Sequence, residues 1–190
     1  WTTVLHCNEK PFDDVRVRKA FKLAMDRESW VRVTQMGYAI PGNDTPLAPI
    51  YDGLEGVLPT VQDIEQAKAL LAEAGYPNGL DLKCQFINDY TTDHATWLAG
   101  AVEKAGFRLE LQPNPEYWQV WLNDWGENVI GVSNWGMRAT PSEILNIALR
   151  STAAWNDSHW YNEDFDQKLD AYDAELDPTT RKQQLLDIVQ

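Results

Sequence analysis

The sequence predicts an α/β fold, with a mixed sheet, β-α-β crossovers and flanking helices. Between residues 80 and 134, apolar patterning alternates strand, helix, strand, helix, strand, an order that favours parallel strands joined by right-handed crossovers. The chain has 190 residues, of which 44% are hydrophobic, so it can bury a core without disulfides or metals. This length is near that of a single domain, and we expect residues 1–190 to form one.

The segment before residue 80 is predicted to contain one strand, three helices and a long loop. The elements expected before residue 80 are a strand at 3–7, helices over Val17–Met25 and 26–36, and a helix that ends at Gly75. Thr60 to Asp63 has the spacing of a capping box, which would start the third helix. Residues 38–60 are rich in Gly, Pro and Asp, and we expect an ordered loop anchored by Tyr51, Leu54 and Leu58.

The second half supplies the crossovers. Strands are expected at 80–86, 107–112 and 129–133, and helices at Ala95–Val102, at Trp118–Trp125, from Pro141, over Phe165–Leu176 and after Asp177. Thr140, Pro141 and Glu143 form a second capping box, with proline at the first helical position.

Charge and residue usage exclude several classes of protein. The net charge is -13, from 29 acidic and 16 basic residues, and no basic patch of a nucleic-acid binder is visible. Cys7 and Cys84 either form one bridge or are two buried thiols. The three histidines lack metal-ligand spacing, and no phosphate-binding loop or nucleophile motif occurs. We therefore expect no metal, no cofactor and no catalytic residues.

One segment combines features of a ligand site. Asn134, Trp135, Gly136, Met137 and Arg138 follow a strand, and ligands of open α/β sheets bind beyond the carboxyl ends of strands. The indole offers a flat surface, the glycine permits close approach, and the arginine precedes a helix start, which favours anions. Alternatively, the indole packs in the core and the arginine pairs with a carboxylate.

Nine tryptophans leave two other functions open. Trp118, Trp121 and Trp125 have helical spacing, typical of core packing, whereas Trp135, Trp155 and Trp160 lie in or near loops, where an exposed indole can bind flat ligands. The chain could thus be a tryptophan-rich carbohydrate-active enzyme domain, which needs two facing carboxylates, or a protein-interaction module. The acidic pairs Asp13/Asp14 and Asp164/Asp166 lie at helix starts, where capping explains them.

Several motifs together resemble the peptide/nickel/oligopeptide family, family 5, of bacterial ABC-transporter solute-binding proteins. They are residues 11–21 (PFDDVRVRKAF), 24–28 (AMDRE), 37–41 (GYAIP), 67–79 (AKALLAEAGYPNG), the Trp135 region, 160–166 (WYNEDFD) and Arg181. The resemblance implies a lobe of a type II periplasmic-binding fold. The chain would be the second lobe, without the first, of a longer protein, since it begins at Trp1 and ends within an apolar stripe.

The resemblance also implies partners, place and ligand. The full-length protein would trap a small solute between its lobes and present it to an ABC permease, in the periplasm or tethered outside the cell. Relatives bind peptides, nickel complexes, haem, opines, glutathione or oligosaccharides. Peptide-binding relatives often carry an aspartate three residues after the matched tryptophan, where this chain has Arg138, which favours an anionic or hydroxyl-rich group. The solute expected is therefore an oligosaccharide, an opine-like or anionic compound, or a peptide. Some relatives also use a tryptophan that corresponds to Trp118.

Overall fold

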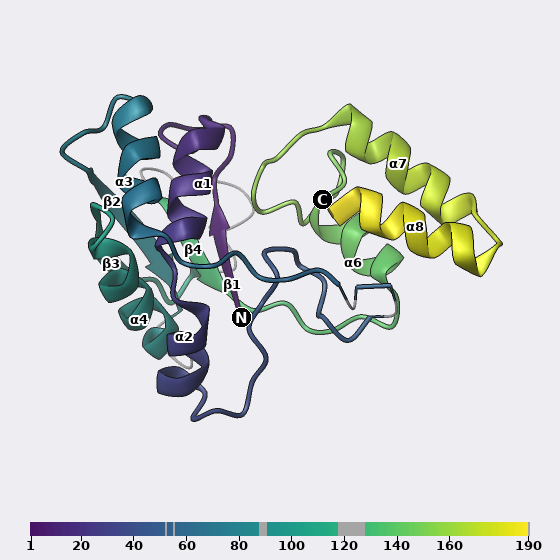
Figure 1. The fold of residues 1–190 in the computed structure, drawn as a ribbon, viewed down its shortest axis with the longest axis horizontal. Coiled ribbons are helices and arrows are strands. Elements are labelled where there is room, and N and C mark those ends of the chain that lie inside the picture. The colour runs from purple at the N-terminus through teal and green to yellow at the C-terminus, as the bar shows by residue number, and fades with distance from the viewer. Residues whose placement is uncertain (52, 55, 88–90, 118–127, 190) are drawn as a thin grey trace. The chain divides into compact units, whose positions relative to one another are not determined.

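The structure is a computed structural model, and it describes residues 1–189 except 52, 55, 88–90 and 118–127 (Figure 1). Contacts divide the chain into two compact units. The sheet unit comprises Trp1–Pro41 and Thr60–Trp135, and the helical unit comprises Gly42–Pro59 and Gly136–Gln190. The helix expected over Trp118–Trp125 lies outside the described residues.

The sheet unit contains one mixed sheet of four strands. They are β1 (Thr2–Leu5), β2 (Leu80–Phe86), β3 (Phe107–Pro113) and β4 (Asn128–Ser133), in the order β1-β4-β2-β3. β2 pairs in parallel with both β3 and β4, whereas β1 pairs antiparallel with β4. The mixed sheet predicted from the sequence is confirmed, and the carboxyl ends of the three parallel strands share one edge.

Four described helices accompany this sheet: α1 (Val15–Ala24), α2 (Arg27–Thr34), α3 (Ile64–Glu73) and α4 (Thr92–Glu103). α1 and α3 lie side by side (Figure 1). The apolar faces of α1, α3 and α4 form one core with the strands, and its fully covered side chains include Phe12, Val17, Phe21, Cys84, Leu98, Val102, Phe107, Ile130 and Val132. Cys7 and Cys84 are both free thiols.

Of three helix ends in α1 and α3, two lie where the local sequence predicts them. Asp14 caps α1, and Gly75 follows α3 with a positive φ of 97°, as its position predicts. The capping box predicted at Thr60 to Asp63 is wrong. The cap of α3 is Asp63, which has extended backbone and accepts a hydrogen bond from Gln66 N–H at 2.9 Å, so the helix begins three residues later.

The helical unit contains α6 (Pro141–Ala148), α7 (Glu163–Ala174) and α8 (Pro178–Val189), with loop 42–59. α7 and α8 lie side by side (Figure 1). The buried apolar residues of this unit are Leu47, Leu54, Ile144, Leu145, Ala148, Phe165, Leu169, Tyr172 and Leu185. Of the residues expected to anchor the loop, Leu54 is buried, whereas Leu58 is 80% exposed and Leu47 is buried in addition. The helix expected over Phe165–Leu176 ends at Ala174, and Leu176 is 91% exposed.

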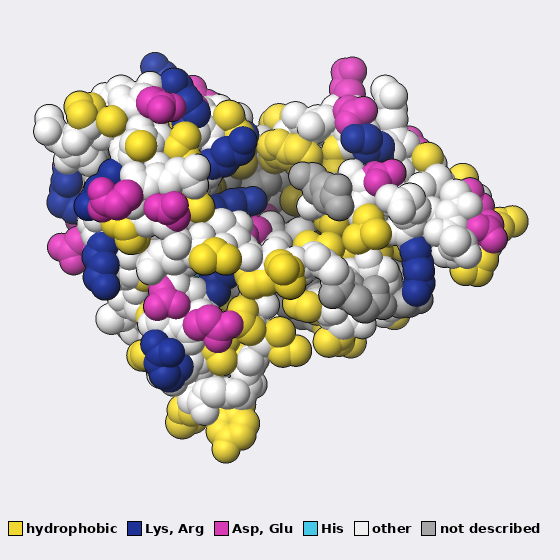
Figure 2. Space-filling model, viewed as in Figure 1, with side chains coloured by type: hydrophobic (Ala, Val, Ile, Leu, Met, Phe, Trp, Pro, Cys, Tyr) yellow, Lys and Arg dark blue, Asp and Glu magenta, His cyan; other side chains and the backbone are white. Residues whose placement is uncertain are grey.

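The surface carries both signs of charge. Over the described residues on the face in Figure 2, basic side chains are interspersed with acidic ones. None of the helices in the described segments has the length and apolarity needed to cross a membrane. Within the same segments, no group of three or more His, Cys, Asp or Glu side chains is arranged to hold a metal ion.

Candidate functional site

The predicted contact stretch begins where β4 ends. β4 is an inner strand, paired with β1 on one side and β2 on the other, and Ile130, Val132 and Ser133 are buried. The stretch from Asn134 to Arg138 then leaves the sheet at its carboxyl edge, where the fold class predicts a ligand.

The division between the two units falls inside this stretch, between Trp135 and Gly136. Asn134 is exposed and Trp135 is half-buried at the end of the sheet unit. In the helical unit, Gly136 is exposed, Met137 is 67% exposed and Arg138 is half-buried. Parts of the stretch therefore remain exposed in both units.

Arg138 is held at three points within the helical unit. Its guanidinium Nη1 donates a hydrogen bond to the Gly136 carbonyl at 2.9 Å. Its backbone N–H donates to the Tyr51 hydroxyl at 3.2 Å, and that hydroxyl donates to the Arg138 carbonyl at 2.5 Å. A Cβ on Gly136 would lie 3.3 Å from Nη1, so glycine leaves room for the arginine to fold back.

The alternative expectation, that Arg138 pairs with a carboxylate, is not met within the described part of its own unit. In residues 42–59 and 136–189 without 52 and 55, no carboxylate forms an ion pair with this guanidinium. Since a guanidinium has five N–H donors, one bond to a carbonyl leaves donors that can bind a carboxylate or hydroxyl.

The helix that follows is capped by its own residues. Thr140 Oγ1 accepts from the Glu143 N–H at 3.3 Å, and a Glu143 carboxylate oxygen accepts from the Thr140 N–H at 3.2 Å, which confirms the capping box. The Glu143 carboxylate already lies at the start of α6, where an anion would otherwise be attracted. Among residues 136–138, Arg138 is thus the side chain that favours binding of a negatively charged group.

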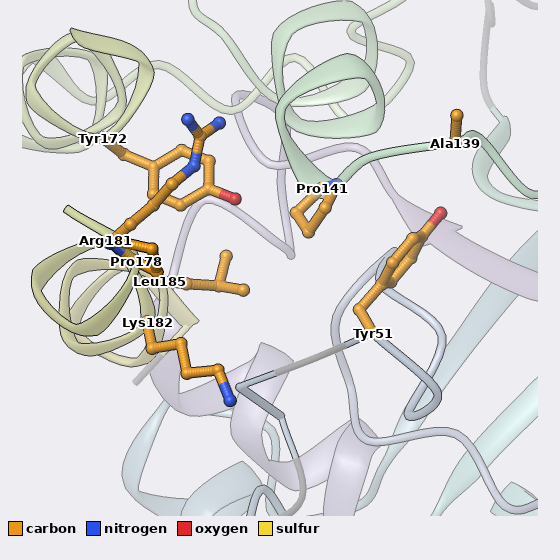
Figure 3. A pocket seen from close by; sticks show the side chains of 8 residues that line it. All are labelled: Tyr51, Ala139, Pro141, Tyr172, Pro178, Arg181, Lys182 and Leu185. Atoms are coloured by element: carbon orange, nitrogen blue, oxygen red, sulfur yellow. The ribbon is translucent and has the colours of Figure 1, made fainter. Parts of the chain in front are cut away.

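A cavity of about 300 Å³ lies beside the stretch in the same unit (Figure 3). Its lining residues come from loop 42–59, the start of α6, and α7 and α8: Tyr51, Ala139, Pro141, Tyr172, Pro178, Arg181, Lys182 and Leu185. The Arg181 guanidinium lies 4.4 Å from the centre of the Tyr172 ring and donates to the Glu175 carbonyl at 3.2 Å. Because Arg181 contacts the face of an aromatic ring and a carbonyl at the end of α7, we assign it a role in packing these helices.

Three of the four carboxylates considered for a hydrolase have local partners. Arg16 donates hydrogen bonds to Asp14 and lowers the pKa of that carboxyl to about 2, while Asp14 caps α1. Asp164 pairs with Lys168 at 2.7 Å, and Asp166 accepts from the Ser151 N–H at 3.0 Å. These carboxylates stabilise local structure, and nothing in their contacts favours the enzyme alternative.

Trp155 and Trp160 both lie in loops, as predicted. Trp155 is 49% exposed, whereas Trp160 is half-buried and packs edge-on against Phe165, 5.2 Å between ring centres. Trp118, predicted to bind ligand, lies outside the described residues. The contact of Tyr51 with Arg138 was missed, because the two residues are 87 positions apart and no local motif links them.

Comparison with known proteins gives first the fold and then the family. NikA from Staphylococcus aureus, solved in complex with Ni(L-His)2, superposes with a TM-score of 0.88 at 22% identity, over 98% of this chain and 41% of that chain. DppA from Helicobacter pylori, solved with the peptide STSA, gives a TM-score of 0.86 at 22% identity, over 98% and 38%. The fold is that of type II periplasmic binding proteins.

The family model of bacterial extracellular solute-binding proteins, family 5 (middle region), matches residues 1–157, and the chain belongs to this family. Heme-binding protein A of Haemophilus influenzae is 28% identical over 170 residues, which are 84% of this chain and 31% of that protein. Glutathione-binding protein GsiB of Pectobacterium atrosepticum is 37% identical over 75 residues, 40% of this chain and 14% of that protein. The chain thus spans less than a third of these curated relatives, and the family resemblance drawn from its motifs is confirmed.

Proposed function

We propose that this chain is the second lobe of a solute-binding protein that serves an ABC transporter. The full-length protein would capture a small solute between its two lobes and deliver it to a permease in the membrane. It would work in the periplasm or outside the cell, tethered to the membrane. Family membership and the position of Asn134 and Trp135 directly after the carboxyl end of β4 support this function.

The solute that suits the site best is anionic or rich in hydroxyl groups. The observation that carries this proposal is Arg138, which has no carboxylate partner in the described part of its unit and keeps donors to spare. An ammonium group would be repelled there, so the amine-binding mode of peptide-binding relatives does not suit this position. Trp135 would pack against the solute, with Asn134, Gly136 and Met137 beside it and Trp118 as a further contact.

Glutathione is the first probe, because it has two carboxylates and proteins named for glutathione binding match part of this chain. Titration calorimetry of the full-length protein would compare it with the tetrapeptide Ser-Thr-Ser-Ala, nickel with L-histidine, haem, an opine and a neutral oligosaccharide. We expect binding of an anionic or hydroxyl-rich probe. A protein that bound only the zwitterionic tetrapeptide would contradict the proposed solute class.

Arg138→Ala tests the site itself. For an anionic probe, loss of a charge-assisted hydrogen bond should weaken binding by about 10- to 100-fold. Arg108→Ala is the matched control, because Arg108 lies near the start of β3, away from the carboxyl edge, and pairs with Asp81 at 2.6 Å. Unchanged affinity in Arg138→Ala, or an equal loss in both variants, would remove Arg138 from the site.

A further inference from the structure

We propose that Tyr51 is a positioning residue, which holds Arg138 in its binding geometry without touching the solute. Its hydroxyl accepts from the Arg138 N–H at 3.2 Å and donates to the Arg138 carbonyl at 2.5 Å. Both polar backbone groups of one residue are thus satisfied by one side chain from a distant loop. The role of Tyr51 in affinity rests on the proposed function, whereas its hold on the backbone does not.

The described residues on either side of Tyr51 can serve as such a support because they are buried or hydrogen-bonded. Leu47 and Leu54 on either side of Tyr51 are 2% and 1% exposed. The Tyr51 N–H donates to the Ala48 carbonyl at 3.2 Å, and the Leu54 N–H donates to the Tyr51 carbonyl at 3.1 Å. The aromatic ring therefore projects from a backbone tied on both sides, and it lines the cavity beside Pro141 (Figure 3).

Within the described part of the helical unit, residues 136–138 have two hydrogen bonds with the Tyr51 hydroxyl and one inside the segment itself. Met137 is 67% exposed, and the Arg138 guanidinium folds back on the Gly136 carbonyl at 2.9 Å. Without the hydroxyl, the Arg138 N–H and carbonyl would bond to water and the segment would sample more backbone conformations. A solute would then have to order the segment on binding, at an entropic cost. By keeping the segment ordered, Tyr51 would raise the affinity for the group that Arg138 binds.

The hold on the backbone is tested without any ligand. Tyr51→Phe keeps the ring and removes only the hydroxyl. In the full-length protein, deuterium uptake of the peptide spanning residues 136–140 should become about two- to tenfold faster, the effect expected when the Arg138 N–H loses its one hydrogen bond. Tyr161→Phe is the control, because Tyr161 is 60% exposed in the same unit. Equal uptake in Tyr51→Phe and the unmodified protein would overturn the proposal.

The coupling to binding is tested by a double-mutant cycle with glutathione as the probe. Tyr51→Phe alone should weaken binding by about two- to tenfold, and it should have no further effect in the Arg138→Ala background. Losses that simply multiply would show that Tyr51 acts independently of Arg138 and would overturn the positioning role. If the unmodified protein does not bind glutathione, that result counts against the proposed solute, and the deuterium exchange decides the role of Tyr51.

Discussion

His94 is a single buried residue that makes the stability of the sheet unit depend on pH. Its ring is 7% exposed and lies among the indoles of Trp1, Trp30 and Trp97, at centre distances of 6.3, 5.6 and 6.0 Å. Its Nε2 is 3.0 Å from Thr3 Oγ1. Burial lowers the pKa of His94 from 6.5 to about 3. The folded protein therefore keeps this imidazole neutral where an unfolded chain would protonate it.

Stability should consequently fall as pH falls. Between pH 6.5 and 3 the unfolded state binds one proton more at His94, so this contribution is complete above pH 6.5 and is lost progressively below it. At pH 5 the loss is about 2 kcal/mol in the free energy of unfolding. Urea unfolding at pH 7 and pH 5 would measure it, and His94→Gln should reduce the difference between the two pH values by that amount. The same difference in both proteins would contradict the assignment.

Residues were predictable from sequence when their partners are local. Asp14, Gly75 and the pair Thr140 and Glu143 were found because a cap and its partner lie within a few positions. Thr60 was misassigned because Asp63 competes for the same role and its carboxylate accepts from an N–H three residues on. The contact between Tyr51 and Arg138 depends on the fold of the whole unit, so no spacing rule could find it.

At the scale of elements, the parallel pairing of β2 and β3 begins at two glycines that touch. Gly79 has φ of +81° and Gly106 has φ of +102°, and a Cβ on Gly79 would lie 2.2 Å from the Gly106 carbonyl oxygen. The Leu80 N–H donates a hydrogen bond to that same oxygen at 2.8 Å. This bond lies at the start of the strand pairing, in which Leu80 is opposite Phe107. The close approach of the two turns thus sets how the strands, and their carboxyl ends at the site, are aligned.

Gly79→Ala should therefore destabilise the sheet unit strongly. The positive φ and the backbone clash act together, and we expect a loss of roughly 2–4 kcal/mol in the free energy of unfolding. Gly100→Ala is the matched control, because Gly100 is exposed in α4 and a Cβ there meets no atom within 4 Å. That change should stabilise the helix by about 0.5–1 kcal/mol. Urea denaturation would compare the two, and a loss below about 1 kcal/mol in Gly79→Ala would refute the steric argument.

The described strands were predictable because each carries its own apolar pattern, whereas their order was not. β4 follows β3 in sequence but lies between β1 and β2, and β1 pairs with it across more than 120 residues, as in Thr3 with Val132. Strand order depends on which buried faces fit together. Alternation along the chain predicts parallel neighbours, but it does not say which strands they are.

At the scale of the whole molecule, each unit has its own buried apolar residues. Leu98 lies in the core of the sheet unit and Leu169 in the helical unit, and both are fully buried. The expectation of one domain over residues 1–190 stays a prediction, because compactness by contacts does not measure cooperativity. Whether the units unfold together is a thermodynamic property that a chemical probe in one of them can report.

Cys84 is such a probe. It is 0% exposed in β2, between β3 and β4, and burial raises its pKa to about 12, so a thiol reagent should modify it only when the sheet unit opens. Leu98→Ala should speed this labelling by roughly 30-fold or more, since such a change costs about 2–5 kcal/mol and 1.4 kcal/mol is a factor of ten. Leu169→Ala, with the same chemistry in the helical unit, should leave the rate unchanged if the units open separately, as we predict from their separate cores.

Mass spectrometry of iodoacetamide labelling at low urea would measure both rates, with half-buried Cys7 as an internal reference for the reagent. Equal acceleration by the two substitutions would instead show a single cooperative domain, and the length-based expectation would then hold.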